Sequence, residues 1–361
     1  MKNFRNGQTS DIQKPSLLHC QTKQGTLFFV AHNNGTPALP GNGGTRIKMY
    51  ASPEDAAREC QGLSAVMTHK HAVYNTGFTG AKLVVVADPA RLDKAELLDT
   101  MGGVLNFLGG SVYTGCDMNT TLEDMEYLLR RTPYVLASLG SAIDPNVATA
   151  YGVYGGLLSL CMGRLYGKRF LVHGTGNVGA TLAALLAGAG AEVFTYDLVP
   201  ERAEIPGCRN MSDRTDWWNI PCNVLVPCSH SGLVTETIAR RLECDWIAGS
   251  ANIPFGTAAV PGILASRDIS YIPEAITSAG AILCDSVEHY NRETFLQAAP
   301  ADMYAYVQGL VAEKTAEFID VLRLDACSEL EALGCVFTDP LQAPCGTRFH
   351  ELAGTGVPVL V

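Results

Sequence analysis

The stretch RFLVHGTGNVG, residues 169–179, decides the fold class. It opens with an apolar run, passes through three glycines spaced as GxGxxG, and leads into an alanine- and leucine-rich segment. The apolar run predicts a buried strand, and the segment after the glycines predicts a helix. A second apolar run, residues 192–196, follows and ends next to Asp197. Strand, glycine turn, helix and strand in this order predict a doubly wound parallel sheet.

The glycine spacing between a strand and a helix is typical of a dinucleotide-binding turn. Gly174 permits the tight turn, Gly176 lets the main chain approach a pyrophosphate, and Gly179 lets the helix pack closely on the strand. The helix N-terminus offers N–H groups to phosphate. Asp197 would bind ribose hydroxyls and repel a 2′-phosphate, so we predict NAD rather than NADP; a nucleotide-free turn is the alternative. The predicted cofactor contacts here are Gly174, Thr175, Gly176, Asn177, Val178, Gly179 and Asp197.

Further apolar runs predict strands at residues 224–226, 246–248, 271–272 and 281–283. Ligands of open parallel sheets bind beyond the carboxyl ends of the strands. Small and polar residues stand just past these ends, which suits a nicotinamide riboside, although ordinary loops have the same composition. We predict additional cofactor contacts at Cys228, Ser229, Ala248, Gly249, Ser250 and Asn252.

The first third of the chain mixes short strands with helices. Strands are predicted at residues 27–30 and 83–86, and helices at 54–67 and 122–130. A length of 361 residues favours two domains. We therefore predict a two-domain α/β protein. The N-terminal α/β domain comprises residues 1–141, with 310–361 returning to it, and the Rossmann dinucleotide-binding domain comprises residues 142–309.

The composition excludes several classes of protein. Hydrophobic residues make up 47% of the chain and charged residues 17%, which excludes disorder. A net charge of -10 gives no basic surface for nucleic acid. No apolar run is long enough to span a membrane, and the polar N-terminus does not resemble a signal peptide. The twelve cysteines are scattered and form no CxxC pair, so we expect a cytoplasmic protein with reduced thiols and no metal site.

Two lysines and an aspartate are candidates for catalysis. Lys82 adjoins the apolar run 83–86, and partial desolvation beside a second lysine, Lys70, would favour loss of its proton. Asp117 lies in a polar segment after a glycine-rich stretch. Solvated surface lysines and a loop or helix-capping aspartate are the alternative interpretation.

Nine segments in order resemble the glutamate/leucine/phenylalanine/valine dehydrogenase family, and most closely its leucine and phenylalanine branch. The resemblance covers roughly residues 26–295. The segments are GGTR (43–46), MTHKHA (67–72), TGAK with ADP (79–82 and 87–89), GCDMNTT (115–121), PNVATAYGVYGG (145–156), GTGNVG (174–179), PCSHSGLV (227–234), AGSAN (248–252) and SAGAILC (278–284).

The resemblance implies an NAD-dependent L-amino acid dehydrogenase that forms a homo-oligomer through its first domain. It implies that Lys70 binds the substrate carboxylate, that Lys82 is the general base that activates water, and that Asp117 exchanges protons with the amino group. A hydride would leave Cα for the nicotinamide, and water would then attack the iminium to give a 2-oxo acid and ammonia. The reverse reaction is reductive amination. Further substrate contacts are expected at Gly44, Met67 and Asn252.

The expected side-chain pocket departs from the family pattern. Ile282 fits the usual small apolar lining, but Asp285 stands where valine is common, and Asn42 lies in a segment, PALPGNGGTR, that is longer than the usual PALGGTR. Asp285 could form a structural salt bridge, point away from the pocket, or bind an indole N–H, a hydroxyl or an amine on the substrate. Gly115 would leave room for a bulky side chain. We therefore predict an aromatic substrate, similar to tryptophan or phenylalanine, or a specialised polar amino acid.

Other functions remain open at this stage. A branched-chain amino acid dehydrogenase and a redox-neutral enzyme with tightly bound NAD, such as a cyclodeaminase, would use the same fold. A non-catalytic binding protein is less consistent with the joint presence of Lys70, Lys82 and Asp117. A hydroxy-acid dehydrogenase would usually need a His–carboxylate pair or an arginine, and His173 at a strand end is more typical of packing.

Overall fold

The computed structural model describes residues 14–325, 327–339 and 342–349. The N-terminal stretch 1–13 and residues 350–361, which carried some of the predictions above, lie outside this range. The chain forms two compact units. The first contains the described residues up to Ser141 together with Asp285–Leu296 and Phe337–Arg348, and the second contains Ala142–Cys284, Gln297–Val336 and Phe349.

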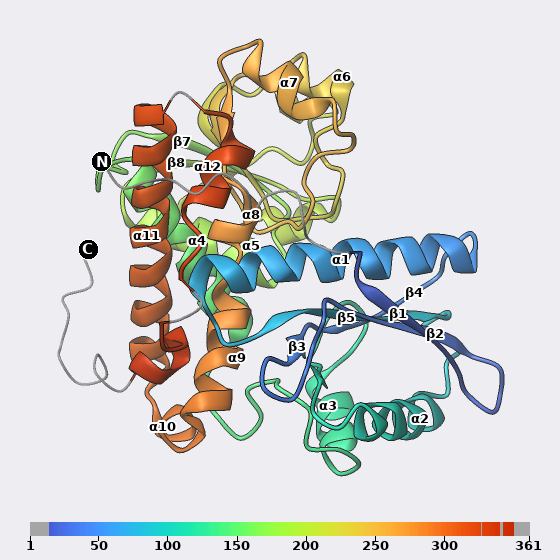
Figure 1. Ribbon diagram of the computed structural model, residues 1–361. Helices are drawn as coiled ribbons and strands as arrows, with labels where there is room; N and C mark the ends of the chain where they lie inside the picture. Colours follow the sequence, from blue (N-terminus) through green and yellow to red (C-terminus); the bar gives the residue numbers. More distant parts are fainter. Residues whose placement is uncertain (1–13, 326, 340–341, 350–361) are drawn as a thin grey trace. The chain divides into compact units, whose positions relative to one another are not determined.

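The first unit is built on a mixed sheet in the order β1-β2-β5-β3-β6, with β4 also paired to β5. β1 and β2 run antiparallel to their neighbours, whereas β3 and β4 run parallel to β5. Helix α1 covers one face of the sheet, and α2 and α3 cover the other (Figure 1). The elements are β1 (Ser16–Gln21), β2 (Leu27–His32), β3 (Gly41–Asn42), β4 (Thr45–Lys48), α1 (Pro53–Tyr74), β5 (Thr79–Val86), α2 (Lys94–Phe107), β6 (Val112–Tyr113) and α3 (Leu122–Leu129).

The central strand β5 is nearly all buried because helices cover both faces of the sheet. Its side chains alternate between the two layers. Leu83 and Val85 pack on the side of α2 and α3, while Val84 packs against α1. By this alternation Lys82 belongs to the α1 face. Arg46 of β4 shares that face, since Ile47 packs on the opposite side.

Helix α1 is longer than the predicted helix 54–67 and carries Lys70. It begins after Ser52, whose hydroxyl accepts a hydrogen bond from the N–H of Asp55 at 3.1 Å. It ends at Asn75, which adopts the left-handed conformation with φ 45°. The prediction ended the helix too early because His69 and Lys70 are polar and interrupt the apolar pattern. Lys70 and the neighbouring residue 71 are nevertheless buried.

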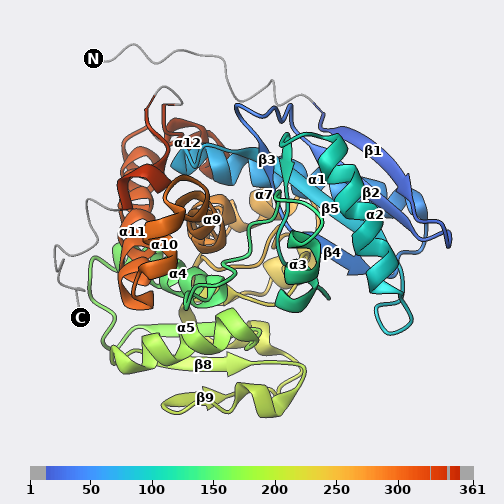
Figure 2. The ribbon, with the colours of Figure 1, turned by 90° about the horizontal axis from the view of Figure 1, so that it is seen from below.

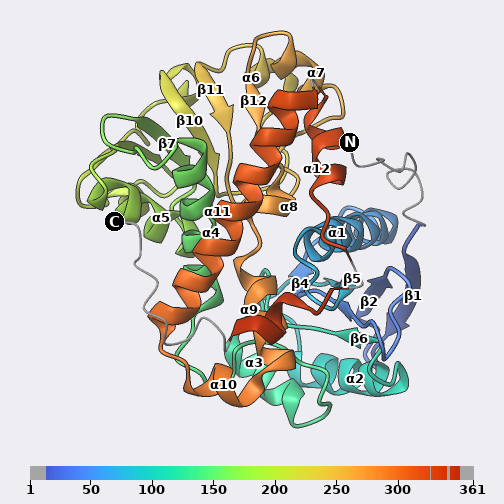
Figure 3. The same cartoon turned by 60° about the vertical axis from the view of Figure 1, so that its left-hand side comes forward.

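The second unit contains a sheet of six parallel strands in the order β12-β11-β10-β7-β8-β9. The order reverses between β7 and β10, and such a reversal marks the ligand-binding edge of doubly wound sheets. Figure 2 shows α5 beside β8 and β9, and Figure 3 shows β7, β10 and β11. The strands are β7 (Arg169–His173), β8 (Glu192–Tyr196), β9 (Cys208–Asn210), β10 (Cys222–Pro227), β11 (Cys244–Ile247) and β12 (Ser270–Tyr271). The predicted fold class, a two-domain α/β protein with a Rossmann sheet, is confirmed.

Nine helices and two 3-10 turns complete the described part of this unit, with α9 and α10 crossing into the first unit. They are α4 (Pro145–Leu160), α5 (Asn177–Gly188), η1 (Pro200–Ala203), η2 (Trp217–Asn219), α6 (Glu236–Ala239), α7 (Val260–Ala265), α8 (Glu274–Thr277), α9 (Gly280–Tyr290), α10 (Arg292–Gln297), α11 (Pro300–Asp325) and α12 (Glu329–Cys335). The short 3-10 turn η3 (Cys345–Arg348) belongs to the first unit. In the described residues, no helix is long and apolar enough to cross a membrane.

Helix α11 lies in the second unit, although the sequence assigned residues from 310 onward to the first domain. It packs along α4, as Figure 3 also shows. Glycines on α4 allow this close approach: a Cβ at Gly155 would collide with the carbonyl of Gln308, and one at Gly152 would contact Val307. Of the described residues in the predicted returning segment, only those within Phe337–Arg348 group with the first unit.

The predicted strand at residues 281–283 is part of helix α9. A run of three apolar residues is compatible with either structure. Here Leu283 and Val287, four residues apart, are both fully buried, as expected for one face of a helix. A Cβ at Gly280 would collide with the main chain of Thr149, so the helix starts at a position where only glycine fits.

Candidate functional site

In the first unit, Lys82 and Asp117 form an ion pair between the Nζ atom and Oδ2. Lys82 projects from β5 and its side chain is only 7% exposed. Asp117 lies in the turn that follows β6, where its N–H donates to the Thr120 hydroxyl at 2.9 Å. The Thr120 hydroxyl donates in turn to the carbonyl of Thr45 at 3.1 Å, which ties the turn to β4. The two predicted catalytic residues therefore meet on the sheet.

Arg46 joins this pair from the neighbouring strand. Its Nε donates to Oδ2 of Asp117 at 3.1 Å, and Nη1 donates to Oε1 of Glu59 at 2.6 Å. Glu59, on α1, also accepts a hydrogen bond from Lys48 at 3.2 Å. The result is a largely buried chain of alternating charges, Lys82–Asp117–Arg46–Glu59–Lys48.

The cations set the charge of Asp117. Burial alone would raise the pKa of its carboxyl, but Lys82 and Arg46 outweigh burial and hold the pKa far below its usual range. Burial and cations oppose each other in the same way at Glu59, whose pKa is also lowered. Asp117 is therefore ionised at neutral pH.

Lys70 lies on α1 with its side chain buried, and Met67 lies three residues earlier on the same helix face. His71 follows Lys70 and is fixed by Thr76, whose hydroxyl lies 2.6 Å from Nδ1, and by the carbonyl of Asn42, 3.2 Å from Nε2. Burial lowers the pKa of His71 to about 4, so the ring is neutral. Both ring nitrogens are engaged, and no group of three metal-ligating side chains occurs in the described residues.

The two predicted substrate-site glycines have different surroundings. A Cβ at Gly44 would lie 2.9 Å from the Cβ of Asp117, so this glycine lets the β3–β4 turn pass directly beside the candidate acid–base pair. A Cβ at Gly115 would instead collide with the carbonyl of Leu136. The space expected for a bulky substrate is thus filled by main chain, and Gly115 is needed for that close approach.

Asp285 and Asn42, the two departures from the family pattern, are in direct contact. The Nδ2 atom of Asn42 donates to Oδ2 of Asp285 at 2.7 Å. Asn42 belongs to β3 and is fully buried, while Asp285 lies on α9 and is partly buried. Ile282, the other predicted pocket residue on α9, belongs to the second unit.

In the second unit, the three glycines of the GxGxxG turn have the predicted geometry. Gly174 adopts a φ of 93°, and a Cβ there would lie 2.6 Å from Ser229. Gly179 packs against the carbonyl of Gly174, where no Cβ would fit. At Gly176 a Cβ would meet no atom within 4 Å, so the space outside the turn is open. Asn177 and Val178 begin α5 here, and no side chain caps its N–H groups.

Asp197 follows β8 and is fixed by the turn. Its Oδ2 accepts hydrogen bonds from the N–H of Thr175 at 2.8 Å and from the Thr175 hydroxyl at 3.4 Å, and its Oδ1 accepts from the N–H of Val199 at 2.9 Å. Burial alone would raise the pKa of Asp197, but these hydrogen bonds lower it below the usual range. A fixed carboxylate therefore stands beside the glycine turn.

The segments beyond β10 and β11 lie side by side at the same edge of the sheet. The N–H of Cys228 donates to the carbonyl of His173 at 2.8 Å, and the N–H of Ser250 donates to the carbonyl of Pro227 at 2.9 Å. Ser229 contacts His173 through its hydroxyl, 3.0 Å from Nδ1. This histidine was predicted to be a packing residue, and its ring stacks on Tyr196.

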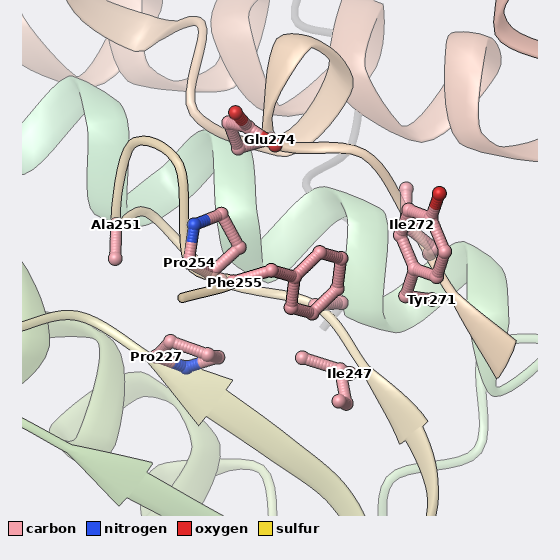
Figure 4. A pocket seen from close by; sticks show the side chains of 10 residues that line it. Pro227, Ile247, Ala251, Pro254, Phe255, Tyr271, Ile272 and Glu274 are labelled. Atoms are coloured by element: carbon pink, nitrogen blue, oxygen red, sulfur yellow. The ribbon is translucent and has the colours of Figure 1, made fainter. Parts of the chain in front are cut away.

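A small pocket opens where β10, β11 and β12 end (Figure 4). Ala248 and Gly249, two of the predicted cofactor contacts, belong to its lining. Asn252 follows Ala251, the next residue of the lining along the chain. The carbonyl of Asn252 accepts a hydrogen bond from the Ser231 hydroxyl at 2.7 Å. The complete lining is Pro227, Ile247, Ala248, Gly249, Ala251, Pro254, Phe255, Tyr271, Ile272 and Glu274.

Comparison with known proteins identifies the relatives of the chain. Residues 20–134 match the model described as "Glu/Leu/Phe/Val dehydrogenase, dimerisation domain", and residues 198–323 match "Glutamate/Leucine/Phenylalanine/Valine dehydrogenase". A leucine dehydrogenase of Geobacillus stearothermophilus is 30% identical over 307 residues, which are 81% of this chain and 83% of that protein.

The chain belongs to the glutamate/leucine/phenylalanine/valine dehydrogenase family. The resemblance deduced from the ordered motifs is thereby confirmed, and the protein is an oxidoreductase of the amino acid dehydrogenase class. A phenylalanine dehydrogenase of Bacillus thermotolerans is 29% identical over 361 residues, which cover 95% of this chain and 92% of that protein.

Solved structures of this family share the fold. The L-tryptophan dehydrogenase of Nostoc punctiforme has a TM-score of 0.70 at 22% identity, with 94% of this chain and 96% of that chain covered. The hetero-hexameric glutamate dehydrogenase of Thermus thermophilus has a TM-score of 0.73 at 20% identity, with 94% and 89% covered.

Sequence reasoning missed Arg46 and Glu59. Arg46 was part of the GGTR motif, but no role was assigned to it, and Glu59 was not singled out. One pattern could have indicated them. Arg46 alternates with the apolar Ile47 on a short strand, and Glu59 adjoins the buried Cys60 on a helix, so both charges border the sheet rather than solvent.

Proposed function

We propose that the protein catalyses the NAD-dependent oxidative deamination of an L-amino acid to the 2-oxo acid and ammonia, a reaction that is reversible as reductive amination. The observation that carries the proposal is the largely buried Lys82–Asp117 ion pair, on the same unit as the buried Lys70, in a member of an amino acid dehydrogenase family. Binding of a dinucleotide alone would require none of these three residues.

Three residues of the first unit would each have a separate role toward the substrate. Lys70 pairs with the substrate carboxylate. Lys82 is an ammonium ion in the pair with Asp117, so it acts as the base only after it has released a proton. It then takes a proton from the attacking water, and Asp117 exchanges protons with the amino group and the departing ammonia. Arg46 and Lys82 keep Asp117 ionised in the free protein. A proton can pass directly between Lys82 and Asp117 because the two side chains are already in contact.

NAD fits the second unit and would supply the hydride acceptor. The open space at Gly176 and the uncapped start of α5 suit a pyrophosphate. The fixed carboxylate of Asp197 suits ribose hydroxyls and would repel a 2′-phosphate. Cys228, Ser229 and the segment 248–252 border the same sheet edge and suit the nicotinamide riboside.

The assembly we infer is a homo-oligomer formed through the first unit, which matches a model described as a dimerisation domain. Light scattering on the purified protein would test this, since a monomeric mass at micromolar concentration would contradict it. The substrate we infer has an aromatic or polar side chain.

The reaction is tested by measuring NADH formation at alkaline pH with twenty L-amino acids, each with NAD and with NADP. Lys82→Ala should lower kcat by roughly 10²–10⁴-fold, the usual contribution of a general base, and should leave the Kd for NAD unchanged. Lys94→Ala, which removes a lysine paired with Asp124 elsewhere in the first unit, is the matched control. Retained turnover in Lys82→Ala would remove this residue as the base. Cofactor that stays bound through purification without net NADH formation would favour the redox-neutral alternative.

A further inference from the structure

Asp285 has one hydrogen bond and no counter-ion in the described part of the chain. Its Oδ2 accepts from Asn42 at 2.7 Å. No lysine, arginine or histidine among the described residues pairs with it, and its Oδ1 has no protein partner there. Oδ1 is not among the fully buried side-chain atoms that lack a hydrogen-bond partner in the described residues, so it is open to solvent or to a ligand.

The electrostatic surroundings favour a positive or donor group at this position. Burial raises the pKa of Asp285, the hydrogen bond from Asn42 lowers it and the charge of Glu288 raises it, and together they bring the pKa to about 8. Glu288 itself accepts hydrogen bonds from the N–H of Ser138 at 2.9 Å and from Arg292 at 3.1 Å. The neighbouring carboxylate is therefore satisfied, and Asp285 is not.

The Asn42–Asp285 pair borders the candidate catalytic residues of the same unit. Asn42 pairs with Gly80 on β5, two residues before Lys82, and its carbonyl is the partner of His71, which follows Lys70. Cys116 precedes Asp117. Burial and the charges of nearby carboxylates, Asp285 and Asp117 among them, raise the pKa of the Cys116 thiol to about 11. The Asn42–Asp285 pair thus lies on the part of the first unit that carries β5, His71 and Asp117.

A purely structural role does not account for the pair. Helix α9 is attached to the first unit by other bonds. The Ser286 hydroxyl donates to the carbonyl of Thr76 at 2.7 Å, and the Tyr290 hydroxyl donates to the carbonyl of Gly77 at 3.1 Å. An apolar side chain at position 285 would pack against these elements without the desolvation cost of a carboxyl group.

We propose that Asp285, positioned by Asn42, binds a hydrogen-bond donor on the side chain of the amino acid substrate. The donor is an N–H or O–H group, either neutral, as in an indole or a phenol, or cationic, as in a terminal amine. This inference rests on the proposed function, because it takes the first unit as the substrate site. It narrows the substrate to amino acids that carry such a group.

Matched pairs of amino acids test the inference. Tryptophan against 3-benzothienylalanine, tyrosine against phenylalanine, and lysine against norleucine each differ mainly by the donor. At alkaline pH, where a carboxyl group with a pKa of about 8 is ionised, the wild-type protein should prefer the donor in at least one pair. The preference should be roughly 10- to 100-fold, the range expected for a hydrogen bond to a charged group. The pair that responds identifies the donor as neutral or cationic. No preference of tenfold in any pair would overturn the proposal.

Substitutions at Asp285 and Asn42 test whether the preference for a donor-bearing substrate depends on Asp285. Asp285→Asn keeps the shape but presents an amide, and Asp285→Val removes the polar group; both should abolish the preference. Asn42→Ala should weaken it. Glu293→Gln, an exposed carboxylate on α10, is the control and should leave the preference unchanged. If Asp285→Val does not fold, Asp285→Asn alone tests whether the preference depends on this carboxyl group. A preference that survives in Asp285→Asn would overturn the assignment.

Binding and turnover are measured separately, so that this inference and the proposed function can fail independently. Kd values for the six amino acids are obtained by calorimetry in the presence of NAD, and kcat/KM from NADH formation. Donor-selective binding without turnover would contradict the proposed function and support the role of Asp285. Turnover of norleucine or phenylalanine equal to that of their donor partners would support the function and contradict the role of Asp285.

Discussion

Arg46→Met tests whether the buried chain of charges holds the candidate site together. Arg46 is the central cation, with its Nε 3.1 Å from Asp117 and its Nη1 2.6 Å from Glu59. Its side chain is only 10% exposed. Methionine has a similar length and no charge, so the substitution removes both ion pairs and retains much of the packing.

The expected loss of stability follows from burial. Removing one partner of a buried ion pair costs about 3–5 kcal/mol. Here Asp117 keeps Lys82 and Glu59 keeps Lys48, and the two carboxylates are 22% and 24% exposed. We therefore expect the free energy of unfolding of the first unit to fall by about 2–3 kcal/mol at pH 7, below the range for an isolated buried pair.

The loss should depend on pH in a defined direction. Burial raises the folded-state pKa values of Asp117 and Glu59, but the cations outweigh burial and lower these values below those of the unfolded chain. Such groups stabilise the fold above their unfolded pKa values, about 4, and that stability is lost as the pH falls through the lowered folded values. Arg46→Met raises the folded values, so the difference from wild type should be largest at pH 7 and narrow below about pH 4.

Hydrogen exchange across a urea series measures this for the first unit, using peptides from β4 and α1. Tryptophan fluorescence monitors the second unit in the same samples, because Trp217, Trp218 and Trp246 all lie there. Arg131→Met is the control, since the Arg131–Asp99 pair is a solvated surface pair whose loss should shift the midpoint far less. Equal midpoints for Arg46→Met and wild type at pH 7, or a difference that does not change with pH, would refute the reasoning.

Two further substitutions address the cofactor site and the sheet. Asp197→Ala should weaken NAD binding and raise the ratio of NADP to NAD turnover, because the repulsive carboxylate is gone; an unchanged ratio would exclude this role. Gly43→Ala should lower the thermal midpoint by several degrees, because its Cβ would collide with the carbonyl of Ala81. Gly62→Ala, where a Cβ meets nothing within 4 Å on α1, should leave the midpoint unchanged or raise it. A loss of stability in both alanine variants would contradict the collision argument.

The fold of the second unit and the geometry of its glycine turn could be predicted closely because they depend on consecutive residues. The turn at Gly174 needs a positive φ, the helix starts at once, and Asp197 ends the next strand, so each feature follows from local sequence. Strand order then follows from the connection rules of doubly wound sheets. The segment 281–283 was wrongly predicted as a strand, because a short apolar run has no periodicity that distinguishes a strand from a helix.

The first unit was harder to predict because its interactions join distant residues. Arg46 and Asp117 come from different elements, and only the sheet brings them together. The interpretation of Gly115 failed for the same reason: a glycine in sequence does not say whether a ligand or another segment occupies the space, and here it is the carbonyl of Leu136. The roles of Lys70, Lys82 and Asp117 came from the family resemblance rather than from local pattern.

The two proposed sites depend on the sequence in different ways. The proposed cofactor turn depends on its glycines and on main-chain N–H groups. The substrate subsite proposed here depends on two side chains, Asn42 and Asp285, that are far apart in sequence and meet at 2.7 Å. Either polar group alone would be buried without its partner, which is unfavourable, whereas the two together satisfy one another and leave one oxygen for a ligand. The two departures from the family pattern are therefore best understood as one feature, and that feature is polar where aliphatic substrates would need an apolar lining.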